Sequence, residues 1–265
     1  MFCPRKIEIE KTNLSRSRIY FFAFFAVLAA NIFSFAFEDI HIREYNGNLK
    51  TVNLNGGFSI GNVSGNCEVS ANGGTVKIGI IAGDLTAITS AGDIEIEEVN
   101  GDIVAVTRAG NIFINKAHKH VYAETVLGEI VINSADSVDA KNIVGGDVKL
   151  LDISSFAKVS AAGNIVLMIR DESPGSDLCE LKNTNGDTTV YLPETFGAKI
   201  EIKIPILRDS TEETHIRSDF YFSDINQWHE EGKYLNITTV INKGGPRIKF
   251  IINKGNIYLK ALKSR

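Results

Sequence analysis

Apolar and polar residues alternate in short runs through the middle of this chain, and most runs begin just after a glycine. In Gly92–Ile96 the second and fourth residues after the glycine are isoleucines, and a glutamate stands between them. The segments 83–87 and 128–132 have the same apolar spacing. Alternation with a period of two predicts β-strands that bury one face. The Gly-Asp and Gly-Asn pairs predict turns, because these residues tolerate positive φ and bond locally to the backbone.

The glycines themselves recur with a fixed period of nine residues. From Gly47 to Gly146, a glycine occupies ten of the twelve positions spaced nine apart, and only Lys119 and Ser137 interrupt the series. A fixed period of this kind predicts a repeat architecture, in which units that cannot bury their apolar face alone stack into a continuous core. Each nine-residue unit is therefore expected to form one turn and one short strand.

A second period of 18 residues is superimposed on the first. Thr89, Thr107 and Thr125 each precede a repeat glycine by three residues, and the alternate units have no threonine there. Two kinds of unit in alternation predict two strands per coil, one in each of two opposed sheets. The pattern therefore predicts an all-β fold: a parallel β-solenoid of nine-residue strand–turn units and 18-residue coils, in a single elongated domain.

The regularity of the pattern divides residues 37–265 into two parts. Residues 37–186 are expected to form the regular solenoid. In residues 187–265 the spacing widens, and residues 207–238 mix charged with aromatic side chains, which indicates a long loop or an expanded coil. Because the open edge of a terminal coil would pair with other chains, residues 187–265 are expected to form expanded C-terminal coils and a cap of the same solenoid.

Residues 1–36 have the features of a secretory signal peptide. Basic residues outnumber acidic ones in residues 1–18, an apolar run covers 19–30, and Ser34 and Ala36 supply small residues at a cleavage site. The run is shorter than the ~20 apolar residues of a membrane span. We therefore expect removal near Ala36, no transmembrane domain afterwards, and export to the periplasm or cell surface of a bacterium; an uncleaved anchor is the alternative.

The composition of the expected mature chain excludes one class of partner. Residues 37–265 contain 23 basic and 30 acidic residues, a net charge of −7. A nucleic-acid partner requires a clustered positive charge, so none is expected. Two cysteines remain, Cys67 and Cys179. Cys67 occupies a repeat position that is otherwise apolar, which favours a small buried side chain over a disulfide.

The repeat units also carry a family resemblance. The units Thr89–Ile94 and Thr107–Ile112, the segment Tyr191–Pro193 and the closing unit Gly255–Leu259 resemble a bacterial adhesin-type β-strand-repeat family of uncharacterised function. The resemblance covers about residues 40–262. It implies an exported β-solenoid of the cell envelope with a role in adhesion or envelope response, and it implies no catalytic residues.

Three groups of polar residues have the composition of a functional site, and each also has a simpler interpretation. A calcium-binding β-roll needs aligned aspartates in Gly-Gly-x-Gly-x-Asp repeats. Here each unit has one key glycine, and the series of residues after it is an incomplete ladder: Asn48, Gly57, Asn66, Thr75, Asp84, Asp93, Asp102 and Asn111. Glu95 and Glu97 point outward on one strand, but a solvated strand face has nothing to separate their pKa values. His118 and His120, with Glu124, form a conceivable zinc trio, although two histidines in a polar turn are commoner. We therefore expect no metal, no cofactor and no catalytic residues.

The best binding candidate is an unusually apolar outer face. If the alternating Leu, Ile and Ala positions point inward, their neighbours on adjacent coils point outward. A contiguous exposed apolar patch usually marks a contact surface. The alternative is that the aromatic segment 207–238 covers it. The residues of this predicted patch are Thr86, Ile88, Val104, Val106 and Tyr122.

These observations favour an exported, noncatalytic, adhesin-like binding or structural module of the cell envelope. The expected partner is an envelope polysaccharide or an envelope protein, held against a rigid rod. Two alternatives stay open: a carbohydrate-active β-helix enzyme, and a self-assembling envelope scaffold.

Overall fold

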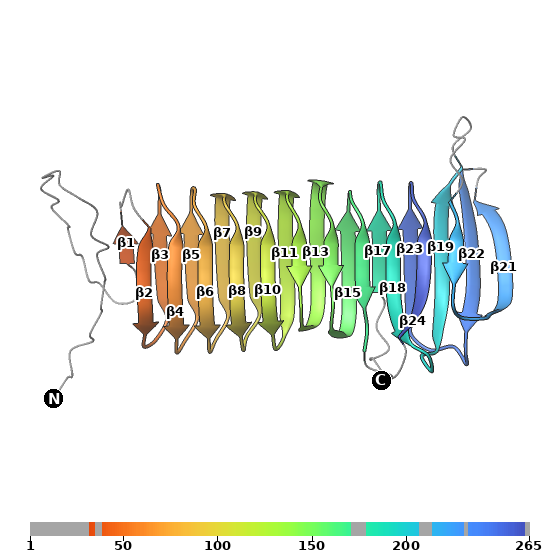
Figure 1. The fold of residues 1–265 in the computed structure, drawn as a ribbon, viewed down its shortest axis with the longest axis horizontal. Helices are drawn as coiled ribbons and strands as arrows, with labels where there is room; N and C mark the ends of the chain where they lie inside the picture. Colours follow the sequence, from red (N-terminus) through yellow and green to blue (C-terminus); the bar gives the residue numbers. More distant parts are fainter. Residues whose placement is uncertain (1–31, 35–38, 171–178, 207–213, 231–232, 263–265) are drawn as a thin grey trace, which may run out of the picture.

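The computed structural model describes residues 32–34, 39–170, 179–206, 214–230 and 233–262, with only the backbone for 32–34. Across these residues all regular structure is β, and the strands form an elongated stack of two opposed sheets with about eight turns (Figure 1). The prediction of a parallel β-solenoid is confirmed.

The two sheets contain thirteen and eleven strands within the described residues. The 13-stranded sheet has the order β1 (Ile32–Ser34), β3 (Leu49–Asn53), β5 (Cys67–Ala71), β7 (Leu85–Ala91), β9 (Ile103–Ala109), β11 (His120–Leu127), β13 (Ala135–Gly145), β15 (Ile153–Ala161), β17 (Cys179–Asn183), β23 (Arg247–Ile252), β19 (Ala198–Pro205), β22 (Tyr234–Ile241) and β21 (Phe222–Glu230). The 11-stranded sheet has the order β2 (Ile40–Tyr45), β4 (Phe58–Val63), β6 (Val76–Ile81), β8 (Ile94–Val99), β10 (Ile112–Ala117), β12 (Ile130–Ile132), β14 (Val148–Leu150), β16 (Ile165–Met168), β18 (Thr188–Pro193), β24 (Ile257–Leu262) and β20 (Ile216–Ser218).

Successive coils pair in parallel with a register of 18 residues. Leu49 lies beside Cys67, Cys67 beside Leu85, and Leu85 beside Ile103. The inward side chains of both sheets meet in one core, and Leu85, Ile103 and Ile112 are each no more than 1% exposed. Full burial of one such side chain contributes about 2 kcal/mol. One coil has nothing to bury its inner face against, so stability comes from the stack.

A ladder of side-chain hydrogen bonds links the turns along one edge of the stack. The Asn48 Oδ1 atom accepts a hydrogen bond from the Asn66 amide at 2.9 Å, and Asn66 Oδ1 accepts one from the Asp84 amide at 3.0 Å. Asp84 and Asp102 continue the ladder to the His120 amide. In this ladder the residue after the repeat glycine is an acceptor for the next coil, which explains why Asp and Asn are interchangeable there and favours the turn interpretation over calcium.

On the other edge of the stack, which includes Gly92 and Gly110, two steric effects disfavour any residue but glycine. Gly110 has a φ of +154°, which disfavours a side chain, and a Cβ atom there would overlap the backbone carbonyl of Gly92 in the preceding coil. The turns are stacked so closely that a methyl group has no room between them.

The threonines of the 18-residue period lie inside the stack beneath these glycines. Thr107 is 1% exposed, and its hydroxyl donates to the Gly92 carbonyl at 3.0 Å; Thr125 donates to the Gly110 carbonyl at 3.0 Å. A buried carbonyl left without a donor is costly. The Gly92 and Gly110 carbonyls both lie on one edge of the stack, and each coil passes that edge once. A threonine is therefore needed once per coil, which is every second nine-residue unit.

The strand order changes after β18. Strands β23 and β24 lie directly on β17 and β18, although residues 194–246 come between them in the sequence. Strand β19 then pairs with β23, and β22 and β21 follow as antiparallel strands at the end of the sheet (Figure 1). The closing unit Gly255–Leu259 therefore lies inside the stack, and the excursion formed by β19 to β22 ends it.

Most of the segment predicted as a signal peptide, including Ala36, lies outside the described residues. The backbone of β1 falls within that segment and pairs with β3. Among the residues that the structure describes, no helix is long and apolar enough to cross a membrane.

The two described cysteines do not form a disulfide. Cys67 lies on β5 and Cys179 on β17, and both are free and buried. Burial raises the pKa of the Cys67 thiol to about 12 and that of Cys179 to about 11. The apolar interpretation of Cys67 holds, and the disulfide alternative does not.

Candidate functional site

The five residues of the predicted patch lie together on the outer face of the 13-stranded sheet. They form two columns that run along the stack: Thr86, Val104 and Tyr122 are in register in one, and Ile88 and Val106 in the other. Ile88 is 41% and Val104 37% exposed. The alternation of the strands places these side chains outside because their neighbours fill the core.

The described part of segment 207–238 does not cover this patch. Strands β21 and β22 form the far end of the 13-stranded sheet, and β11, β13, β15, β17, β23 and β19 lie between them and β9. Strand β20 belongs to the opposite sheet. The alternative in which the aromatic segment folds back over the patch is therefore wrong for the described residues of that segment, which leave the patch uncovered.

A polar cluster borders the patch on β11 and β13. The Tyr122 hydroxyl donates to Glu124, and Lys141 donates to the Tyr122 oxygen at 3.1 Å while its Nζ atom lies 4.8 Å from the centre of the Tyr122 ring. The hydrogen bond to Glu124 raises the pKa of the Tyr122 phenol, and the hydrogen bond to Tyr122 raises the pKa of Lys141. At the other border, Lys50 and Glu68 form an ion pair of 2.6 Å. The patch is thus an apolar strip between charged ends.

The conceivable zinc trio is not brought together. His118 places Nε2 2.7 Å from the Glu98 carboxylate, whereas His120 places Nδ1 3.0 Å from the Ser137 hydroxyl. Glu124 contacts Tyr122 instead. Contact with His118, and then with Lys116, lowers the pKa of Glu98. No group of three His, Cys, Asp or Glu side chains able to hold a metal occurs in the described part of the chain.

The two outward glutamates of β8 contact different neighbours. Glu95 forms an ion pair of 3.0 Å with Lys77, and Glu97 accepts a hydrogen bond of 2.9 Å from Asn115. Both contacts join one coil to the next on the outer face of the 11-stranded sheet. One carboxylate thus has an ion-pair partner and the other a hydrogen-bond partner on neighbouring strands, which differs from the shared environment of two catalytic carboxylates.

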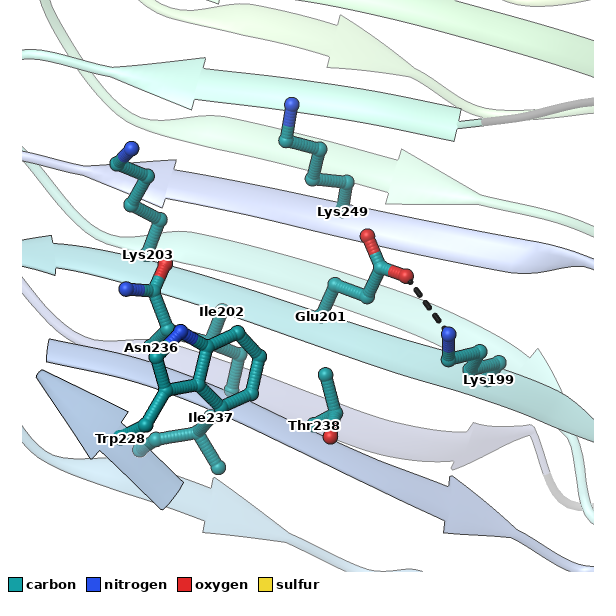
Figure 2. Close-up of a pocket in the computed structure, with 9 residues that line it drawn as sticks. All are labelled: Lys199, Glu201, Ile202, Lys203, Trp228, Asn236, Ile237, Thr238 and Lys249. Carbon is teal, nitrogen blue, oxygen red and sulfur yellow. Dashed lines mark ion pairs between the residues drawn. The ribbon is translucent and has the colours of Figure 1, made fainter. Parts of the chain in front are cut away.

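Sequence reasoning missed a shallow groove near the end of the 13-stranded sheet. The groove has a volume of about 220 Å³ and lies over β23, β19, β22 and β21. Figure 2 shows Trp228, Asn236 and Lys203 along one side, Thr238, Glu201 and Lys249 beside them, and Lys199 beyond. Trp228 is 44% exposed. The aromatic residue among charges was visible in the sequence, but nothing there indicated which strands would lie next to it.

Ion pairs and a ring contact hold the walls of this groove. Lys203 contacts Glu230 at 2.6 Å and lies 4.2 Å from the centre of the Tyr234 ring. The contact with Lys203 lowers the pKa of Glu230. Glu201 pairs with Lys199 at 3.0 Å. The groove therefore combines an exposed indole with oriented cations and amide and hydroxyl groups, which suits a ligand with both apolar and anionic parts.

No family model, no curated protein and no solved structure matches this chain. The adhesin-type resemblance therefore stays a prediction, and functional inference depends on the two surfaces described above.

Proposed function

We propose that this protein is an exported, noncatalytic binding or structural module of the bacterial cell envelope, similar in role to an adhesin. Its stacked core holds side chains in columns at the strand spacing of ~4.8 Å, and a partner would be recognised by these columns. The partner class is an envelope polysaccharide or an envelope protein.

One observation carries this proposal: the apolar patch is contiguous, is exposed at Ile88 and Val104 and half-buried at its other residues, and lies on the most regular part of the fold. Val104 lies between Thr86 and Tyr122 in register, and all three are fixed by buried residues on either side of them. An uncovered patch of this kind marks a contact surface. Because neighbouring strands hold it on both sides, the surface needs little ordering when a partner binds.

A matched pair of substitutions tests the contact role. Val104→Asp places a charge in the patch, and Val131→Asp makes the same change on an outward position of the opposite sheet. We expect purified protein to co-sediment with isolated bacterial cell walls, Val104→Asp to lower the bound fraction at least fivefold, and Val131→Asp to leave it within twofold. Equal losses for both variants, or no co-sedimentation of the unsubstituted protein, would contradict the proposal.

The enzymatic alternative is tested on the polar cluster beside the patch. We expect pectin-like and peptidoglycan polymers to remain intact after incubation with the protein. Cleavage that disappears in Glu124→Gln would replace the noncatalytic role with a catalytic one. The scaffold alternative is tested by sedimentation velocity, where a monomer at high concentration is expected and concentration-dependent polymers would favour self-assembly.

Export is tested by mass analysis of the mature protein from fractionated bacteria. The proposal predicts a new N-terminus near residue 37 in the periplasmic or surface fraction. An intact Met1 in the inner-membrane fraction would show that residues 1–36 are retained as an anchor.

A further inference from the structure

The outer face of the 13-stranded sheet carries a second feature, a single column of cationic and neutral side chains that ends at the only tryptophan of the chain. Pairing registers place these residues side by side on consecutive strands from β13 to β21. We name this the cationic column; its residues are Lys141, Ser160, Lys182, Ile251, Lys203, Asn236 and Trp228.

The lysines of the cationic column recur on every second strand. Strand β15 separates Lys141 from Lys182, and β23 separates Lys182 from Lys203. At a strand spacing of ~4.8 Å, successive charges lie roughly 10 Å apart. This is close to the distance between alternate sugars in an extended polysaccharide. A linear polymer with one acidic group on every second sugar would therefore meet one lysine per disaccharide.

The neighbouring column differs because its charges alternate in sign. Lys158, Glu180, Lys249 and Glu201 follow one another on consecutive strands, and Lys249 pairs with Glu180 at 3.1 Å. That column largely neutralises itself. In the cationic column no carboxylate stands between Lys141 and Trp228, and Lys182 forms no ion pair within the described residues. Lys141 lies 3.9 Å from Glu124, which precedes it in the register, and Lys203 pairs with Glu230 at 2.6 Å. Lys182 thus presents an uncompensated positive charge among the described residues of a protein whose net charge is −4, and Lys141 and Lys203 would exchange a carboxylate of this chain for one of the ligand.

Trp228 supplies a flat apolar surface at the end of the cationic column. Its partner in the register is Asn236, and Lys203 lies on the next strand along, so the indole, an amide and an ammonium group are adjacent (Figure 2). The C–H face of a pyranose ring packs on an indole, the amide can bond its hydroxyls, and the ammonium group can bind its carboxylate. The groove volume of about 220 Å³ is below the ~300–1,000 Å³ of sites for whole small ligands, which suits one sugar unit of a longer chain.

We propose that the cationic column binds a linear acidic polysaccharide that carries a carboxylate on alternate sugars, with a terminal or internal ring packed on Trp228. The chain would run along the stack axis from β21 towards β13. This proposal deepens the binding role proposed above by naming the ligand class, and it uses strands other than those of the apolar patch.

The intrinsic fluorescence of Trp228 reports binding at this place without a label, because the full chain contains one tryptophan. The probe is an octasaccharide of hyaluronan, in which every second sugar is a uronic acid, titrated at physiological ionic strength. We expect a saturable change in fluorescence with this probe and no change with neutral cello-octaose.

Two exposed lysines on adjacent strands provide a matched comparison. Lys182→Gln removes a charge from the cationic column, and Lys158→Gln removes the same charge from the neighbouring column. We expect Lys182→Gln to weaken binding of the octasaccharide at least fivefold and Lys158→Gln to change it less than twofold. Both variants are checked for an unchanged circular dichroism spectrum.

The proposal would be overturned if the octasaccharide showed no saturable binding, or if the two lysine variants lost the same amount of octasaccharide affinity. It would also be overturned if oligo-dT bound equally tightly with the same fluorescence change, because that result would indicate a general polyanion surface. Val104→Asp is expected to bind the octasaccharide normally. The cell-wall assay of Val104→Asp therefore tests the apolar patch, and the octasaccharide titration tests the cationic column, so that either hypothesis can be rejected without the other.

Discussion

The regular coils and the C-terminal end of the stack bury the same kind of core but order their strands differently. From β2 to β18 each new strand joins the sheet opposite to the one before it, in sequence order. Beyond β18, the final pair β23 and β24 is placed ahead of β19 and β20, and the antiparallel pairs of the described chain occur only there. The repeat sets the strand order from β2 to β18. Contacts between residues that are distant in sequence set the strand order beyond β18.

A ladder of the same kind on the other edge of the stack, where Asp93 accepts from the Asn111 amide, continues across this change of order. The Asn256 amide donates to Asp187 Oδ1 at 2.8 Å across 69 residues of sequence, as the Asn66 amide donates to Asn48 across 18 residues. The inner register is therefore set by the chemistry of the turn and core positions, whatever the length of chain between two coils. The outer face has no such constraint, and there the two parts differ most: apolar columns on β7 and β9, cations and an indole on β19 to β21.

Hydrogen exchange should show the largest difference between the two parts. Strand β9 has a strand on each side and a buried inner face, whereas β21 pairs only with β22 and is mostly exposed. We expect β9 amides to exchange only through global unfolding and β21 amides through local opening, a difference of about 4 kcal/mol. The measurement is exchange followed by mass spectrometry of peptides. Equal protection of β9 and β21 would contradict the distinction.

A methyl group between stacked turns should be nearly as disruptive. Gly110→Ala introduces a Cβ atom that meets the Gly92 carbonyl at a positive φ. We expect a loss of about 3 kcal/mol in the free energy of unfolding, measured by denaturant titration. Gly145→Ala is the control, because no atom lies within 4 Å of the added Cβ. A similar loss in both variants would show that turn spacing does not limit the repeat.

Removing one buried hydroxyl should have a smaller effect that depends on the coil. Thr107→Val leaves the Gly92 carbonyl without its side-chain donor, at a cost of about 1.5 kcal/mol. Thr51 is 1% exposed and its hydroxyl has no hydrogen-bond partner, so Thr51→Val is expected to be neutral or stabilising. Thermal unfolding of the two variants checks this. The explanation of the 18-residue period fails if Thr107→Val is as stable as the unsubstituted protein.

The smallest effect concerns pH and the thiol of Cys67. Its pKa is about 12 in the folded state against 9.0 when exposed, so the folded state retains the proton. The resulting stabilisation is complete below pH 9 and is lost as the pH rises from 9 towards 12. At pH 10 the loss should be about 1 kcal/mol. Comparing Cys67→Val with the unsubstituted protein at pH 8 and pH 10 isolates this contribution, and an equal pH dependence in both would contradict it.

The regular part was predictable from sequence because its signals are local. Gly92–Ile96 contains both the turn and the alternation of its strand, and the same alternation places Ile88 and Val104 outside. The C-terminal part was not predictable in the same way. Strand β21 is exposed on nearly all its residues, so it has no alternation to detect, and Lys182 and Lys203 share a column only because Ile251 lies between them.

The central claim is that strand order along the stack, and not sequence order, sets the distance between outward residues. Spin labels at Glu68 and at Lys158, Glu201 or Lys249, with Cys67 and Cys179 replaced by valine, test it by pulsed electron spin resonance. These residues share one column, on β5, β15, β19 and β23. At ~4.8 Å per strand, the account predicts separations from Glu68 of about 24 Å to Lys158, 34 Å to Lys249 and 38 Å to Glu201. A longer separation for Lys249 than for Glu201 would contradict it.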